Sequence, residues 1–175
     1  MGLVTLGPWV NGRGIFDRLG ADLAEAIVAG AYWLREPGPD AELTIAYCGA
    51  VAPEALAAYQ AVTEDIPKPG SWRSPRPDRL HRDWRAYRAL GEIGVAERLL
   101  ARLRLGAALV TVGDFHPATL SRLGAVAGTA VVPLGVDRFG QSGDIPDLFR
   151  AYGIDTEAIL DAAARACLTA LRGSA

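Results

Sequence analysis

Residues 107–117 read Ala-Ala-Leu-Val-Thr-Val-Gly-Asp-Phe-His-Pro. The first six carry no charge and stop at a glycine, which is typical of a buried strand that ends in a loop. The proline predicts a helix from 117 to about 126, because proline is tolerated in the first turn of a helix. A buried strand followed by a helix is the unit from which parallel sheets are built, so this stretch favours an α/β fold.

The rest of the chain repeats this alternation. Further strands are expected at 31–36, 42–48 and 129–134, and further helices at 21–29, 53–62, 95–105, 145–152 and 157–171. A further helix is expected to begin at about residue 78. Gly153 is expected to end the helix at 145–152, and Asp155 or Thr156 is expected to cap the start of the helix at 157–171. The alternation predicts a layered α/β fold with a largely parallel sheet.

Composition sets the class of protein. The 175 residues are 50% hydrophobic with a net charge of -2, which fits one folded domain and excludes a largely disordered chain. No apolar run is long enough to span a membrane, no secretory signal is visible, and two cysteines make no disulfide framework. We therefore expect a cytoplasmic protein with an N-terminal arm at 1–20 and one domain at 21–175. Seventeen of the 18 basic residues are arginine, which reflects GC-rich codons, as in a GC-rich bacterium.

Two loops are the candidate site, because ligands of open α/β sheets bind at the carboxyl ends of strands. Asp114 and His116 could form an oriented acid–base pair; the alternative is that His116 makes an ordinary hydrogen bond at a helix start. The candidate ligand or interface residues are Asp114, Phe115, His116, Asp137, Phe139, Gln141 and Ser142. No nucleophile motif and no metal-ligand spacing accompany them, so no catalytic residue is assigned. A standalone module that binds a small anion is one alternative function.

A run of arginines offers a second alternative. Every third residue from 73 to 88 is basic, and tryptophans are interleaved: Arg73, Arg76, Arg79, Arg82, Arg85 and Arg88, with Trp72 and Trp84. Arginine with aromatic residues is the composition of a nucleic-acid surface. The competing interpretation is a solvated segment with surface ion pairs, and the mildly acidic chain favours it.

Several segments together resemble a known domain. They are 29–38 (Ala-Gly-Ala-Tyr-Trp-Leu-Arg-Glu-Pro-Gly), 43–58, 77–84 (Pro-Asp-Arg-Leu-His-Arg-Asp-Trp), 109–120, and 133–154 with its Phe-Gly-x-Ser-Gly and Tyr-Gly-Ile. Over residues 21–172 the chain resembles the C-terminal domain of transketolase-like thiamine diphosphate enzymes. The nearest resemblance is to the homodimeric decarboxylating subunit of the pyruvate dehydrogenase complex and its bacterial relatives.

The resemblance implies a three-layer open sheet, mostly parallel with one antiparallel edge strand. In this family the C-terminal domain supports the dimer and has been proposed to bind regulatory ligands. Two other domains hold thiamine diphosphate and magnesium, through a Gly-Asp-Gly…Asn motif and a glutamate. This chain lacks that motif, so the resemblance implies no cofactor here, an inactive isolated chain, and a partner that carries the catalytic domains. Self-association as a homo-oligomer is also expected.

One segment departs from the family pattern. Relatives have an apolar strand where this chain has Pro-Gly-Ser-Trp-Arg-Ser-Pro-Arg at 69–76. Two prolines and two arginines argue against a central buried strand there. A short compensated frameshift in the gene would explain both a lost strand and the new arginines, and residues 1–20 could share that origin.

Overall fold

The computed structural model describes residues 22–140 and 142–173. The expected arm at 1–20 and the candidate Gln141 lie outside these residues. The described elements, in chain order, are α2 (Asp22–Ala29), β1 (Tyr32–Arg35), β2 (Leu43–Cys48), η1 (Gly49–Val51), α3 (Ala52–Asp65), β3 (Gly70–Arg73), α4 (Pro77–Leu90), α5 (Val95–Leu100), β4 (Ala108–Gly113), α6 (Ala118–Ser121), α7 (Gly124–Ala127), β5 (Val131–Leu134), α8 (Ile145–Tyr152) and α9 (Thr156–Gly173).

The described strands form one five-stranded sheet in the order β1-β3-β2-β4-β5. The pairs β3–β2, β2–β4 and β4–β5 are parallel, and only the pair β1–β3 of this sheet is antiparallel. β2 and β4 are buried along their whole length, as uncharged runs between two helical layers should be. The predicted fold class, a mostly parallel sheet with one antiparallel edge strand, is confirmed.

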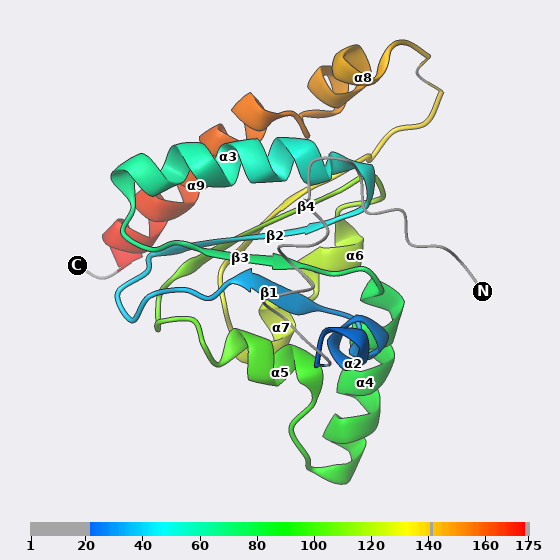
Figure 1. Cartoon of the computed structure of the whole chain (residues 1–175), viewed down its shortest axis with the longest axis vertical. Helices are drawn as coiled ribbons and strands as arrows, with labels where there is room; N and C mark the ends of the chain where they lie inside the picture. Colours follow the sequence, from blue (N-terminus) through cyan, green and yellow to red (C-terminus); the bar gives the residue numbers. More distant parts are fainter. Residues whose placement is uncertain (1–21, 141, 174–175) are drawn as a thin grey trace.

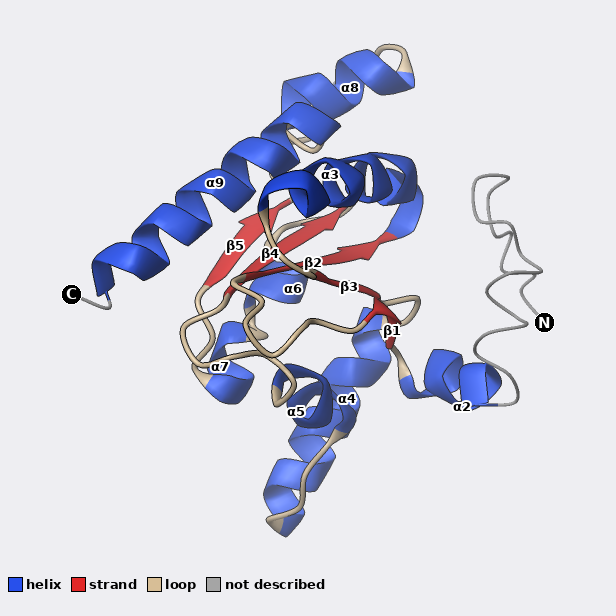
Figure 2. Cartoon of the chain, turned by 60° about the vertical axis from the view of Figure 1, so that its left-hand side comes forward, coloured by secondary structure: helices blue, strands red, loops and turns tan. Residues whose placement is uncertain are grey.

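Helices cover both faces of the sheet (Figures 1 and 2). α3 and α9 pack on one face, where Ile45, Val110 and Ile159 belong to one buried cluster. α4, α5, α6 and α7 lie on the other face, where Leu80 and Leu109 belong to a second cluster. α8 lies beyond the end of α9, away from the sheet, and none of its residues is buried.

The expectation of a missing strand at 69–76 was wrong. Residues Gly70–Arg73 form β3, which lies between β1 and β2 and has three buried residues out of four. Both prolines, Pro69 and Pro75, lie outside these four residues, so neither removes a hydrogen bond from the ladder. Trp72 is 1% exposed and fills the place of an apolar strand residue. The frameshift hypothesis was based on a missing strand at 69–76, and that strand is present as β3.

Two expected helices are shorter than the pattern suggested. The helix expected at 95–105 ends at Leu100 and continues as a turn in which the amide of Leu103 donates to the carbonyl of Leu100. The helix expected at 117–126 is divided into α6 and α7 by turns of the same i→i+3 type. α8 matches its expected bounds, and Gly153 ends it with a φ of 63°.

Candidate functional site

The candidate site lies at the carboxyl ends of β2 and β4. These neighbouring strands lead away in opposite directions, since β2 continues through α3 to β3, while β4 continues through α6 and α7 to β5. In α/β proteins, ligands commonly bind beyond the carboxyl edge at such a reversal of strand order. Gly49 follows β2 and Asp114 follows β4, so Asp114 lies at a strand end, as the sequence pattern predicted.

Asp114 bridges the ends of the two strands. One of its carboxylate oxygens accepts a hydrogen bond of 2.8 Å from the backbone N–H of Ala50. Gly49 has a φ of +87°, and a Cβ there would lie 1.9 Å from the other carboxylate oxygen. A glycine is therefore needed both for the backbone conformation and for the close approach. The amide at the start of this helical segment, which could otherwise bind an external anion, already has the carboxylate of Asp114 as its partner.

His116 has a separate partner. Its Nδ1 atom accepts a hydrogen bond of 3.2 Å from the backbone N–H of Ala118, at the start of α6. The two candidate acid–base residues, Asp114 and His116, thus each bind a different backbone amide. This geometry agrees with the alternative interpretation of His116 as a residue that orders a helix start.

Phe115 joins the two candidate loops at their bases. Its ring covers Gly113, where a Cβ would lie 2.4 Å from the ring. Its carbonyl accepts a hydrogen bond of 2.9 Å from the N–H of Val136, which follows β5. Phe115 therefore packs the loop after β4 against the loop after β5, and its role here is structural.

In the second candidate loop, the described residues 137–140 and 142–143 are exposed. Asp137 pairs with Arg138 at 3.4 Å, and Arg138 donates a hydrogen bond of 3.0 Å to the carbonyl of Ala151 at the end of α8. Phe139 and Ser142 are exposed. These residues face solvent beside α8, so the structure does not bring them together with Asp114 in one pocket.

The arginine run does not form a single charged face. Arg79, Arg82, Arg85 and Arg88 lie on α4, where each step of three residues turns about 300° around the helix axis, so the four spread over half of its circumference. The side chain of Trp72 is buried in the core between the sheet and the helices on the α4 side, so it cannot stack on a base. The ring of Trp84 lies 5.6 Å from the guanidinium of Arg88. Arg76 pairs with Asp78 at 3.0 Å. The geometry favours a solvated surface with local pairs over a nucleic-acid surface.

A groove that was not predicted from the sequence lies between α2 and α4. It has a volume of about 590 Å³ and is lined by Ala24, Glu25, Val28, Ala29, Arg79, Arg82, Asp83, Ala86 and Tyr87. Its two helices are distant in sequence, so no local pattern could reveal it. The carboxylate of Asp83 already accepts a hydrogen bond of 2.6 Å from the N–H of Val95, and no catalytic set converges in the groove.

Residues 22–140 and 142–173 contain no group of three or more His, Cys, Asp or Glu side chains that could hold a metal ion. None of the helices within these ranges is long and apolar enough to cross a membrane. Burial, with a smaller contribution from Asp114, raises the pKa of the Cys48 thiol to about 11. Cys48 is thus held as a neutral thiol beside the candidate site.

The fold of the described residues is transketolase-like, as its similarity to solved structures shows. No protein-family model matches the chain, and no curated protein sequence is similar to it. Among solved structures, it is similar to transketolase from Leishmania mexicana, with a TM-score of 0.60 and 20% identity over 83% of this chain and 19% of that one. Transketolase from Campylobacter jejuni gives a TM-score of 0.53 and 21% identity over 76% of this chain and 18% of that one.

A third similar structure comes from a divided enzyme. A protein described as a split-gene transketolase, in an inactive β4 tetramer, gives a TM-score of 0.57 and 17% identity. The match covers 80% of this chain and 43% of that one. The chain thus spans about a fifth of the two single-chain transketolases and under half of this split-gene chain.

Proposed function

We propose that this chain is the C-terminal domain, or a separate subunit equivalent to it, of a thiamine diphosphate-dependent enzyme of the transketolase or 2-oxo acid dehydrogenase type. In this role it supports the dimer, offers a surface for regulation, and is inactive alone. The observation that carries the proposal is the pair of coverages: the fold matches 83% of this chain but 19% of a transketolase chain.

The similarity to a split-gene transketolase supports the proposal that this chain is a separate subunit. Its description shows that this kind of fold also occurs in an enzyme divided between genes, and that the β4 assembly is inactive. By analogy, activity requires a second polypeptide. The sequence resemblance to the decarboxylating subunit of the pyruvate dehydrogenase complex favours 2-oxo acids as substrates of the assembled enzyme.

The described residues do not fit a magnesium-bound diphosphate. They offer no cluster of metal-binding side chains, and the amide of Ala50 donates to Asp114 rather than to a free anion position. No chemical step is therefore assigned to residues of this chain. The same hydrogen bond argues against a standalone anion-binding module at Asp114.

Complex formation tests the proposal. The genes on either side are searched for a polypeptide that carries a Gly-Asp-Gly…Asn motif. The chain is co-expressed with such a polypeptide, and the two are analysed by size-exclusion chromatography with light scattering. We expect a stable complex that contains both chains and has 2-oxo acid or ketol-transfer activity. A chain that remains separate from such a polypeptide would contradict the proposal.

A further inference from the structure

The groove between α2 and α4 leaves apolar side chains open to solvent. Val28 on the α2 wall is 60% exposed, and the small residues Ala24 and Ala86 line the groove and are exposed as well. Leu90 lies one helical turn beyond Ala86 on the same side of α4, and it is 73% exposed. An apolar face of this kind, bordered by polar residues, is typical of a surface that contacts another protein.

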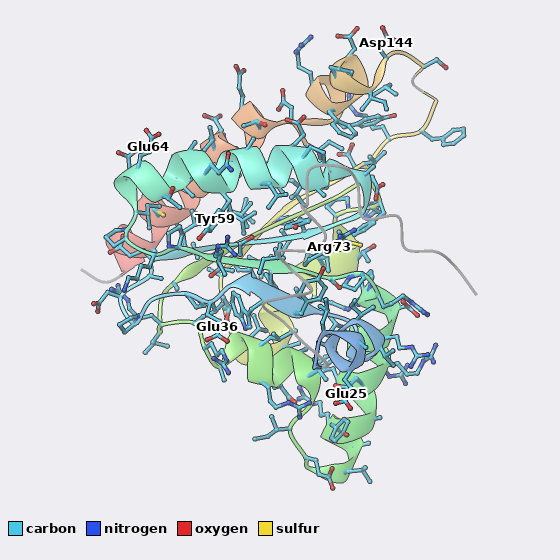
Figure 3. All side chains as sticks on the ribbon, in the orientation of Figure 1. Glu25, Glu36, Tyr59, Glu64, Arg73 and Asp144 are labelled. Atoms are coloured by element: carbon cyan, nitrogen blue, oxygen red, sulfur yellow. The ribbon has the colours of Figure 1, made fainter. Side chains whose placement is uncertain are left out.

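The rim of the groove carries charges of both signs. Glu25 lies on the α2 wall, and Arg79 and Arg82 lie on the α4 wall. All three side chains are exposed, and none of them forms an ion pair with another described residue. Figure 3 shows Glu25 on α2, beside α4. The groove thus has a carboxylate on one wall and two guanidinium groups on the other, around an apolar centre.

This arrangement is complementary to itself. In a two-fold dimer the same surface is used by both copies, so each contact is made twice in reciprocal form. If α2 of one copy lies over the groove of the other, Val28 of each copy enters the groove of the other copy. Glu25 of each copy then meets Arg79 or Arg82 of the other, so the exposed apolar surface is covered and the charges are paired.

We propose that the face formed by α2 and α4 is a two-fold interface between two copies of this chain. The 14 residues of α4 give a helix about 21 Å long, and two helices side by side are about 20 Å wide. A dimer through this face therefore buries about 800–1,000 Å² in total, at the lower end of specific interfaces. We expect a weak dimer, with a dissociation constant of about 1–100 μM.

Sedimentation velocity of the full chain, over about 1–200 μM, measures this equilibrium. Val28→Asp places a charge in the centre of the contact and should weaken dimerisation at least about 10-fold. Because Val28 is exposed in the single chain, the melting temperature at low concentration should stay the same. The control is Arg104→Glu, which reverses an exposed charge in the loop before β4, outside the groove, and should leave the dissociation constant unchanged.

Mixing two charge-reversed chains identifies the contact as intermolecular. Glu25→Arg places only positive charges on the rim, and the double substitution Arg79→Glu with Arg82→Glu places only negative charges opposite Asp83 and Glu25. Each chain alone should dimerise at least about 10-fold more weakly than the original chain, because like charges then meet across the interface. An equimolar mixture should form a heterodimer, since every rim contact between the two different chains joins opposite charges.

Three results would overturn the proposal. The first is a chain that stays monomeric up to about 200 μM, whichever other segment or polypeptide occupies the groove. The second is a dimer that Val28→Asp and Glu25→Arg leave unchanged, since the contact then lies elsewhere. The third is a mixture of the charge-reversed chains that stays monomeric. None of these results bears on the proposed catalytic partner, because the interface requires only this chain.

Discussion

Replacing Trp72 by alanine tests whether residues 70–73 form a buried central strand. Trp72 is 1% exposed, and its ring stacks on that of Trp33 of β1 with the centroids 5.9 Å apart. Truncation of a fully buried aromatic residue costs about 3–5 kcal/mol, which is a large share of the roughly 5–15 kcal/mol that stabilise a domain. Trp72→Ala should therefore leave a folded but much weakened protein.

Urea unfolding followed by circular dichroism measures this loss. With a slope of about 2 kcal/mol per molar urea, the midpoint should fall by about 1.5–2.5 M. The control is Phe139→Ala, since Phe139 is an aromatic residue that is fully exposed and should change stability by less than about 0.5 kcal/mol. A midpoint for Trp72→Ala no lower than that for Phe139→Ala would refute the central position of β3.

Three further substitutions probe the carboxyl edge of the sheet, each measured by urea unfolding. Gly49→Ala should cost more than about 2 kcal/mol, because the new Cβ would collide with Asp114. The control is Gly91→Ala: Gly91 also has a positive φ, +72°, but open space around it, so this substitution should cost only about 1 kcal/mol. Equal costs would contradict the close approach of Gly49 to Asp114. Asp114→Ala should cost about 1–2 kcal/mol through the lost hydrogen bond to Ala50, and a neutral effect would argue against this contact. Burial raises the pKa of Cys48 from 9.0 to about 11. Between these two values the folded chain keeps a proton on Cys48 that the unfolded chain loses. The free energy of unfolding should therefore fall above pH 9, by at most about 1.4 kcal/mol per pH unit. Cys48→Ala should flatten this decline between about pH 9 and 10, and an unchanged slope would contradict the shift.

Local pattern predicted most of the fold because most elements carry their own signal. β2 and β4 are uncharged runs with clear ends, and α8 has a proline in its first turn and Gly153 at its end. The segment 70–73 has no such signal. It is a strand because β1 and β2 pair with it on both sides, and this tertiary context outweighs its composition.

The site was harder to predict, because its contacts join distant parts of the chain. Sequence placed Asp114 at a strand end, but not its hydrogen bond to Ala50, which is 64 residues away. The groove between α2 and α4 likewise joins two helices that are distant in the sequence. Strand register, which the sequence alone does not specify, decides which of these side chains meet.

Calorimetric titration of thiamine diphosphate with magnesium tests the central claim most directly, that this domain depends on a partner for catalysis. The titration is made into the isolated chain, and then into the chain mixed with the polypeptide that carries the Gly-Asp-Gly…Asn motif. The account predicts no saturable heat with the isolated chain and saturable binding with the mixture. Saturable cofactor binding by the isolated chain would contradict it.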